Sequence, residues 1–300
     1  MTFWGERNNG DGVLLGVPKE VALDSSDDAP ADLLKAVFPA SGQWEELAGV
    51  SVYEGGNLLF TGPVDEQNTA FTPEGTEVEL ICRSRAALLL DNEAMPQTLR
   101  CPSLRIIARL FLEPLGFSEP VGSMEAGMGE LTVQKGESCW AVLERFCGDF
   151  LGVRPRVGRD GTLFCDGRWP EPAELSGALS ATLRMLPCKR ISSVCAQNRL
   201  GVYETEFSSP EAEGVLRRRY VDVSGGRSPR EILEEGERAA VGLELVCEGF
   251  ADILPGAAVS AGLPDGSRWE GCTLKSVRYR ADRNGERTRL ILEGGRQECG

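Results

Sequence analysis

The chain has 300 residues, among them 32 Lys and Arg, 46 Asp and Glu, 36 glycines and no histidine, and its net charge is −14. Without an imidazole to take the proton, Ser-His-Asp and Cys-His nucleophile systems are excluded, and zinc, haem and non-haem iron sites lose their commonest ligand. The acidic balance argues against a protein whose main task is to grip phosphates, because that task requires clustered Lys and Arg.

The first ninety residues mostly follow strand patterns. Residues 13–23 are apolar and β-branched, and Gly16 and Pro18 within them suit an edge strand or a bent strand. Pro30 predicts the start of a short helix that Pro39 ends. The apolar face of this predicted helix consists of Leu33, Leu34, Val37 and Phe38.

Two further segments of this region predict paired strands. Residues 50–64 predict a hairpin, because two apolar runs flank the turn residues Gly55-Gly56. Residues 76–83 alternate between acidic and apolar side chains, so one face of that strand points outward and the other inward. Together these segments predict a small antiparallel sheet that is buried on one face.

Helical periodicity replaces strand alternation between residues 84 and 175. Leu104 to Phe111 form an apolar stripe at helical spacing, and Ser138 caps a second predicted helix. A hairpin is predicted around Asp160-Gly161. The proline-rich residues 169–172 then mark a boundary.

The last third is rich in strands and contains one helix. Ser228-Pro229-Arg230-Glu231 is a capping box with proline at the first helical position, and it predicts a helix that ends near Ala240. Strands are predicted at residues 243–247 and after the bend at residues 254–257. A closing hairpin is predicted with its turn at residues 282–285.

These patterns predict an α+β fold that is mainly β. Two antiparallel β modules flank a mixed helical and strand insert. We expect the first β domain at residues 1–90, the insert at residues 91–175 and the second β domain at residues 176–300.

The cysteines have no metal-ligand spacing. No two of them are three residues apart, so the chain contains no C-x-x-C knuckle. Several end apolar alternations, and free cysteine behaves as a small buried hydrophobe. We expect reduced thiols and assembly in a cytosol, since the first seven residues lack the apolar stretch of a secretory signal. The ten are Cys82, Cys101, Cys139, Cys147, Cys165, Cys188, Cys195, Cys247, Cys272 and Cys299.

Two groups of carboxylates are candidate sites. Asp24, Asp27 and Asp28 crowd a short loop but lack the ligand order and the glycine of an EF-hand, which favours a solvated cluster at a helix start. Asp65 and Glu66 are adjacent on a predicted strand, so their side chains point to opposite faces and would not share one substrate, as a glycosidase requires.

The remaining motifs give no catalytic centre. Ser84 and Ser138 have no base to activate them, and no Gly-Lys-Ser or Gly-Lys-Thr of a phosphate-binding loop occurs. The apolar flanks of Arg217-Arg218-Arg219 favour a strand with alternating faces over a nucleic-acid site. We therefore assign no catalytic, cofactor-binding or metal-ligating residue and expect no enzymatic activity.

Residues 131–143, Leu-Thr-Val-Gln-Lys-Gly-Glu-Ser-Cys-Trp-Ala-Val-Leu, resemble the opening of a LysM module. In that family a strand, a Lys-Gly-Asp/Glu-Ser/Thr turn and a Trp-bearing helix form a peptidoglycan-binding fold. The Asn-Pro-rich second loop of the family has no counterpart near residues 148–155. Two interpretations stay open: a packed structural copy of the motif, or a peptidoglycan-binding cell-wall module.

Four segments carry a second and longer resemblance. They are residues 62–66 (Gly-Pro-Val-Asp-Glu), residues 82–94 with the distinctive run Arg-Ser-Arg-Ala-Ala-Leu-Leu-Leu-Asp-Asn-Glu-Ala, the LysM-like residues 133–146, and residues 254–290. In this order and spacing they resemble a phage baseplate hub protein of the late-control-protein-D type, in the version found in Gram-positive prophages. The resemblance extends from about residue 13 to the C-terminus.

The resemblance implies a structural protein of a virion tail baseplate, assembled in the host cytoplasm. Such hubs form homotrimers in which each chain gives two tail-tube-like β-barrel or sandwich domains, and the six domains adapt the sixfold tail tube to the threefold spike. The implied partners are further copies of the chain, a tube or tube-terminating protein, a spike protein and DNA passing through the channel. No cofactor and no membrane are implied.

Two physical arguments accompany this resemblance. A half-buried sheet with an unpaired edge can continue into a neighbouring chain and close a ring without free edges. The net charge of −14 then has two explanations, which stay open. Negative channel walls would repel DNA phosphates, or the charge serves solubility alone.

Overall fold

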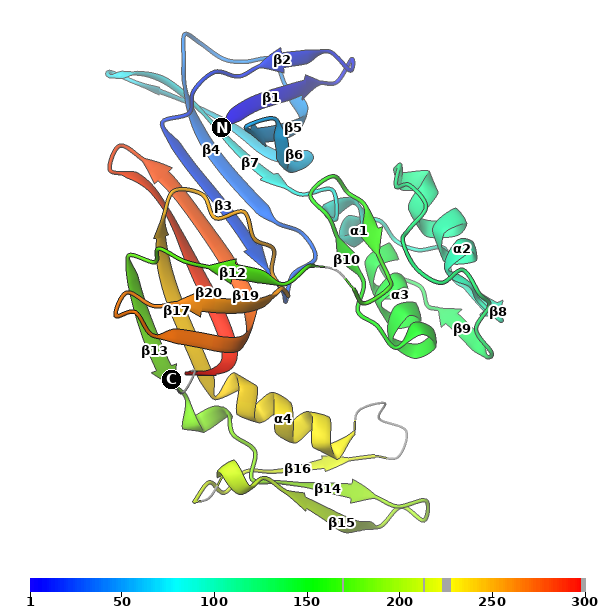
Figure 1. The fold of residues 1–300 in the computed structure, drawn as a ribbon. Helices are drawn as coiled ribbons and strands as arrows, with labels where there is room; N and C mark the ends of the chain where they lie inside the picture. The colour runs from blue at the N-terminus through cyan, green and yellow to red at the C-terminus, as the bar shows by residue number, and fades with distance from the viewer. Residues whose placement is uncertain (169, 213, 223–227, 298–300) are drawn as a thin grey trace. The chain divides into compact units, whose positions relative to one another are not determined.

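The computed structural model describes residues 1–168, 170–212, 214–222 and 228–297. The fold is mainly β, with large antiparallel sheets and few helices, which confirms the predicted class (Figure 1). The chain divides into two compact units, Met1–Trp169 with Arg278–Glu286, and Pro170–Val277 with Arg287–Gly300. This division lies within the proline-rich residues 169–172, and the closing hairpin contributes residues to both units.

Seven strands of the first unit form one antiparallel run in the order β3-β4-β7-β6-β5-β1-β2. They are β1 (Thr2–Arg7), β2 (Gly12–Leu14), β3 (Glu20–Ser26), β4 (Leu33–Ala40), β5 (Leu47–Glu54), β6 (Asn57–Thr72) and β7 (Gly75–Arg83). The first half of β6 pairs with β5 and its second half with β7. The hairpin predicted at residues 50–64 and the strand predicted at residues 76–83 are confirmed.

Alternating side chains of this run fill an apolar core. On β7 the side chains of Val78, Leu80 and Cys82 are buried. The ring of Phe3 on β1 meets the ring of Phe38 on β4 edge-on, with ring centroids 5.4 Å apart. The β1 and β4 parts of the run therefore face each other across the core, and each large side chain buried there contributes roughly 1.5–3 kcal/mol.

The short helix predicted from Pro30 is wrong, because residues 33–40 form strand β4. The buried side chains of β4 are those of Leu34, Ala36 and Phe38. This alternation has the period of a strand, and Lys35 on the other face pairs with Glu79 of β7 at 2.5 Å. Apolar residues at this spacing fit a helix and a strand alike, and pairing with β3 and β7 decides between them.

The apolar stretch at residues 13–23 forms parts of two strands, β2 and β3. Gly16 between them has a φ of +88°, a left-handed conformation that glycine adopts without strain. Pro18 lacks the N–H that a strand ladder needs. The chain therefore leaves the sheet between β2 and β3. Gly16 and Pro18 lie at this break, where the sequence predicts a bend.

The insert of the first unit combines short helices with short strand pairs (Figure 1). Both predicted helices and the hairpin at Asp160-Gly161 are confirmed, and the Ser138 Oγ accepts a hydrogen bond from the Ala141 N at 3.2 Å. The elements are α1 (Ala87–Asp91), β8 (Gln97–Arg100), α2 (Leu104–Ile107), the π-helical turn η1 (Ala108–Leu112), the 3₁₀ turn η2 (Glu113–Leu115), β9 (Glu130–Val133), α3 (Cys139–Phe146), the π-helical turn η3 (Cys147–Leu151), β10 (Arg156–Val157) and β11 (Leu163–Phe164).

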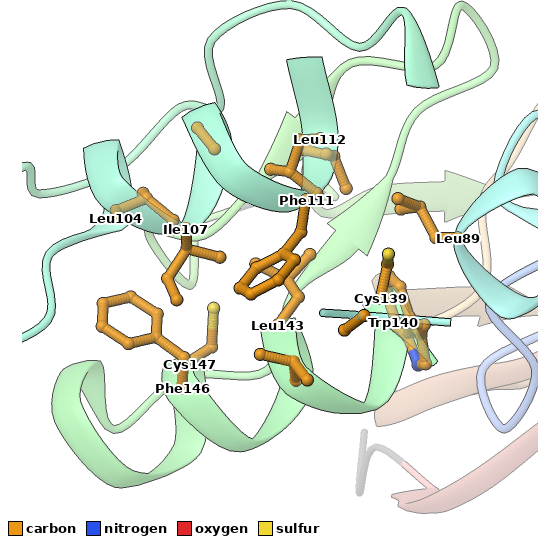
Figure 2. Packing of buried hydrophobic residues seen from close by; sticks show 14 of the residues in the cluster. Leu89, Leu104, Ile107, Phe111, Leu112, Cys139, Trp140, Leu143, Phe146 and Cys147 are labelled. Atoms are coloured by element: carbon orange, nitrogen blue, oxygen red, sulfur yellow. The ribbon is translucent and has the colours of Figure 1, made fainter. Parts of the chain in front are cut away.

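The insert has an apolar core between its helices, which Figure 2 shows from close by. One wall comes from α2 and η1 and the other from α3 and η3, with Leu89 of α1 at the side of Cys139 and Trp140. Phe146 and Phe150 stack with ring centroids 5.4 Å apart. The labelled residues are Leu89, Leu104, Ile107, Phe111, Leu112, Cys139, Trp140, Leu143, Phe146 and Cys147.

The second unit contains strands in the order β13-β17-β20-β19, with β18 next to β19 and β12 next to β18. The pair β12–β18 is parallel and the other pairs are antiparallel. The predicted strand at residues 243–247 and the closing hairpin with its turn at residues 282–285 are confirmed. The strands are β12 (Ala173–Leu175), β13 (Ser180–Met185), β17 (Val241–Glu248), β18 (Ala258–Gly262), β19 (Arg268–Asp282) and β20 (Gly285–Gln297).

A three-stranded sheet and helix α4 (Pro229–Ala239) form the rest of the second unit (Figure 1). Strand β14 (Ser193–Gln197) lies between β15 (Tyr203–Ser208) and β16 (Arg218–Val221). The predicted capping box is confirmed, because the Ser228 Oγ accepts from the Glu231 N at 3.2 Å and the Glu231 carboxylate accepts from the Ser228 N at 2.8 Å. Helix α4 packs on β14 and β15.

The cysteines within the described ranges are free, and most are buried as expected. Cys101 and Cys188 are exposed, and Cys299 lies outside the described residues. Burial raises the pKa of Cys82 to about 12 and that of Cys272 to about 11. The buried thiols are those of Cys82, Cys139, Cys147, Cys165, Cys195, Cys247 and Cys272. In the described part of the chain, no helix combines the length and the apolar character that crossing a membrane takes.

Candidate assembly surfaces

Of the adjacent acidic residues Asp65 and Glu66, Asp65 is bound by Arg83. A register shift between Val64 and Glu66 leaves Asp65 as the extra residue of a β-bulge. The Arg83 guanidinium donates to both carboxylate oxygens of Asp65, at 2.7 and 3.0 Å, and to both of Asp91, at 3.1 and 2.6 Å. Hydrogen bonds from Arg83 hold the pKa of Asp91 below its usual range.

The two residues after Arg83 also have structural partners. The Ser84 N donates to the Asp32 carbonyl at 2.9 Å, and the Asp32 N donates to the Ser84 Oγ at 2.9 Å. The Arg85 Nη2 donates to the Gly116 carbonyl at 2.7 Å, and the guanidinium lies 5.2 Å from the centre of the Phe117 ring. Arg85 thereby ties the end of β7 to the insert.

The end of the same run reaches the LysM-like segment. The Asn92 Nδ2 donates to the Leu88 carbonyl at 2.8 Å, and the Glu93 carboxylate accepts from the Gly136 N at 2.7 Å. The Ala94 N donates to the Glu137 carbonyl at 2.8 Å. The distinctive run from residue 83 to 94 is therefore a junction that joins the sheet, α1 and the turn before α3.

The LysM-like segment has the predicted order of strand β9, turn and helix α3. Trp140 lies in the core of the insert and is 7% exposed (Figure 2). The Glu137 carboxylate accepts from the Arg145 Nη2 at 3.0 Å and from the Gln134 N at 2.6 Å, and Arg145 lowers the pKa of Glu137. The aromatic side chain of this segment is thus turned into the core of the insert.

The acidic cluster at residues 24–28 divides among separate partners. Asp24 binds Arg280 of β19 through two hydrogen bonds of 2.8 Å, and Asp27 pairs with Arg156 of β10 at 2.6 Å. The expected helix start is wrong, because strand β4 follows this loop. Among the described residues, no group of three or more Cys, Asp and Glu is placed to hold a metal ion.

The basic run at residues 217–219 lies partly on strand β16, as predicted. Arg218 and Arg219 belong to β16, and the Arg218 Nη2 donates to the Glu206 carboxylate at 3.1 Å. Arg217 precedes the strand, and its Nη1 donates to the carbonyls of Pro187 and Arg190 at 3.2 and 3.3 Å. The Arg219 Nη1 donates to the Arg218 carbonyl at 3.3 Å, so all three guanidinium groups have local protein partners.

An open groove of about 560 Å³ lies on the outer face of β1, β5 and β6. Trp4, Tyr53 and Leu88 line it, together with the backbone of Gly49 and Gly62. A Cβ atom on Gly62 would lie 2.0 Å from the Arg83 carbonyl oxygen, so this position excludes a side chain. The groove is a candidate contact surface that the sequence alone did not indicate.

The three-stranded sheet of the second unit exposes a pair of tyrosines. The rings of Tyr203 and Tyr220 meet edge-on with centroids 5.2 Å apart, and the Tyr203 hydroxyl donates to the Asp222 carboxylate at 2.6 Å. This hydrogen bond raises the pKa of Tyr203. Exposed tyrosine beside arginine is typical of protein interfaces, which makes this face a second candidate contact surface.

Strands β2 and β13 end the longest run of paired strands, and each has one edge that no other described strand covers. Uncovered edges also occur on β12 and on the outer strands of the smaller sheets, β8, β9, β10, β11, β15 and β16. Strand β13 is exposed along almost its whole length. Its sequence, Ser-Ala-Thr-Leu-Arg-Met, alternates polar and apolar residues, and this alternation could have predicted the strand. An uncovered edge offers backbone N–H and C=O groups for pairing with another chain.

Solved structures of phage tail proteins have the same fold. A tail protein from Neisseria meningitidis MC58 matches with a TM-score of 0.69 at 18% identity over 98% of this chain and 97% of that one. The 43 kDa tail protein of prophage MuSo2 from Shewanella oneidensis matches with a TM-score of 0.75 at 16% identity over 97% of each chain. The fold is thus that of phage tail proteins, which confirms the resemblance at the level of architecture.

A secretion-system protein also has this fold. It is the E. coli c3393 protein, a type VI secretion component described as structurally similar to the T4 tail proteins gp27 and gp5. Its TM-score is 0.57 at 10% identity over 94% of this chain and 76% of that one. No protein-family model and no curated protein matches the sequence.

Proposed function

We propose that the chain is a structural baseplate hub protein of a phage or phage-like tail and has no enzymatic activity. The observation that carries this proposal is the match over nearly the whole length of both chains to tail proteins, with a TM-score of 0.75 for the prophage MuSo2 protein. A match of this extent includes both units and the insert, and not one common β module alone. The fold likeness to a protein described as similar to gp27 and gp5 supports the hub over other tail parts.

In this proposal the chain forms a homotrimeric ring between the sixfold tail tube and the threefold spike. The sheets within residues 1–90 and 176–300 are the two tube-like domains, and residues 91–175 are the insert. Three chains then supply six tube-like domains to the tube side. The uncovered edges of β2 and β13 support assembly, because unpaired edges in a finished particle are normally covered.

The partners in this proposal are a tube or tube-terminating protein on one side and a spike protein on the other. The location is the tail baseplate of the virion, after assembly in the host cytoplasm. The ring encloses a channel through which DNA passes. With a net charge of −14, the channel wall would repel phosphates and keep the DNA from sticking.

Native mass spectrometry tests the hub. The expected result is a threefold mass, either for the chain alone or after purified tube or spike protein is added. A chain that stays monomeric with both partners present would overturn the proposal. The channel is tested separately on the assembled ring, by mapping charge on its inner face: an acidic lumen supports a DNA conduit, and a neutral or basic lumen contradicts it.

A further inference from the structure

The uncovered edge of β13 presents the backbone groups of particular residues. The Leu186 N donates to the Ala240 carbonyl directly opposite at 2.7 Å, and β13 and β17 are antiparallel. In an antiparallel ladder, residues alternate between bonding to one neighbour and pointing away from it. The N–H and C=O groups of Leu183 and Met185 therefore point to the uncovered edge, away from β17.

The same reasoning applies to β2. The Leu15 N donates to the Phe3 carbonyl opposite at 3.0 Å, and the Arg7 N donates to the Asp11 carbonyl at 2.9 Å. By the same alternation, the backbone groups of Gly12 and Leu14 point away from β1 to the uncovered edge. Each edge thus offers two or more residues whose donors and acceptors are free to pair with a strand.

The side chains at the two edges are complementary. When two strands pair antiparallel, residues that exchange backbone hydrogen bonds carry their side chains on one face. Leu183 and Met185 on β13, which are 45% and 56% exposed, would then share a face with Leu14 on β2, which is 57% exposed. Trp4, the neighbour of Leu14 on β1, is 45% exposed on this face.

The opposite face carries opposite charges. Asp11 directly precedes β2, where its carboxylate accepts a hydrogen bond from the Asn9 Nδ2 at 2.7 Å, and Arg184 lies on β13. Both are exposed, and neither forms an ion pair with any residue that the structure describes. If Asp11 stands opposite Arg184, then Gly12 stands opposite Leu183 and Leu14 opposite Ala181. Gly12 has no side chain, so Leu183 has room to pack beside Leu14 and Trp4.

We propose that the edge of β13 in one copy pairs antiparallel with the edge of β2 in the next copy, with Arg184 opposite Asp11. This contact is head-to-tail, because two different edges meet, and head-to-tail contacts close into a ring when the rotation between copies permits. The inference rests on the proposed ring and names the strands that close it.

A mixing experiment with two blocked chains tests the pairing. Leu183→Pro removes an N–H from the β13 edge and Leu14→Pro removes one from the β2 edge, while neither N–H bonds within the chain. We expect each variant alone to stay monomeric by native mass spectrometry and analytical ultracentrifugation. Their mixture has one intact pair of edges and is expected to stop at two chains, one of each kind. Thr182→Val, on the β13 residue that bonds to β17, is the matched control and should leave the trimer intact.

Charge reversal tests the register without proline. Asp11→Arg and Arg184→Asp are each expected to raise the trimer dissociation constant at least tenfold, and the double variant is expected to recover most of that loss. The recovery also distinguishes the pairing from misfolding of the proline variants.

The outcomes separate the two proposals. A trimeric wild-type chain whose proline variants are also trimeric overturns the edge pairing and leaves the hub intact. A trimer that is insensitive to both charge reversals overturns the register. A wild-type chain that never assembles, even with tube and spike proteins, overturns the hub and the edge pairing together.

Discussion

Arg83 and Asp65 form a bidentate pair, with Nε to Oδ2 at 2.7 Å and Nη2 to Oδ1 at 3.0 Å. The same guanidinium also binds Asp91 of α1. One side chain at the end of β7 thus holds a bulge of the sheet and the first helix of the insert. A planar guanidinium with five donors can do this, and a lysine ammonium cannot.

We therefore expect Arg83→Lys to destabilise the first unit. The variant keeps the charge but loses the paired geometry to both carboxylates, and the partly exposed site limits the cost to about 1–2 kcal/mol. Urea denaturation measures the free energy of unfolding. Arg289→Lys, at an exposed pair with Glu244, is the control and should cost less. Equal effects at the two positions would contradict a special role for Arg83.

Gly62→Ala is expected to destabilise the protein through a backbone clash. The added Cβ would lie 2.0 Å from the Arg83 carbonyl oxygen, and backbone on both sides must shift to relieve it. Overpacking of this kind costs about 1–3 kcal/mol. Gly42→Ala is the matched control, because no atom lies within 4 Å of a Cβ there. Thermal unfolding followed by circular dichroism should show a lower Tm for the first variant alone.

Trp140→Ala should act on stability and not on glycan binding. The side chain is buried in the insert core, and removing a large buried aromatic costs about 3–5 kcal/mol. Trp140→Phe retains most of the apolar volume and is expected to be milder. A pull-down on purified peptidoglycan checks the wall-binding alternative. Retention of the wild-type chain that is lost in a folded Trp140→Phe variant would support that alternative against the packed copy.

The Asp32 carboxyl is expected to make the stability of the folded state depend on pH, and the direction of its shifted pKa fixes the sign of that dependence. Burial raises its pKa from 3.8 to about 6, against the opposing effects of a Ser25 hydrogen bond and the charge of Arg159. The folded state then binds more protons than the unfolded state between these values, so this group's contribution to stability falls as pH rises from about 4 to about 6. Asp32→Asn removes the titration.

The measurement is the free energy of unfolding of both chains at pH 4, 5, 6 and 7. As pH rises from 4 to 7, the free energy of unfolding of Asp32→Asn is expected to increase relative to that of the wild type by about 1–3 kcal/mol. The exposed Asp28→Asn is the control. A difference that stays constant with pH would show that Asp32 does not titrate there.

Thiol reactivity should follow burial. In a Cys299→Ser background, Cys101 and Cys188 are expected to react rapidly with a thiol reagent in the folded protein, and the buried cysteines to react after unfolding. The raised pKa of Cys82, about 12, further lowers its thiolate fraction. Mass spectrometry counts the labels with time. Rapid labelling of Cys82 would show that the sheet opens readily at β7.

Elements with local chemical signals were predicted from the sequence. The Ser228 capping box, the Gly55-Gly56 hairpin and the Ser138 cap each depend on residues within a few positions of one another. Strand β4 was not predicted, since its apolar residues fit either period and its neighbours β3 and β7 decide. The candidate contact surfaces likewise depend on which strands become neighbours, and local sequence patterns do not contain that information.

The partners of Asp65 and the uncovered edges depend on strand order, which no local pattern contains. Adjacent carboxylates at residues 65 and 66 gave no hint that a bulge would turn one of them toward Arg83. The alternation in β13 could have predicted a strand, but its position at an edge follows from which strands pair with β17. Local sequence patterns therefore predict where strands lie better than they predict which strands pair and which edges stay uncovered.

Strand β6 has a mechanical consequence. Its sixteen residues hold β5 along one half and β7 along the other, so no loop joins these two parts of the sheet. A force that pulls β5 and β7 apart along the strand direction loads many backbone hydrogen bonds in shear at once. A flexible loop in the same place would extend under a small load. We therefore expect the continuous strand to transmit tension through the first unit with little stretch.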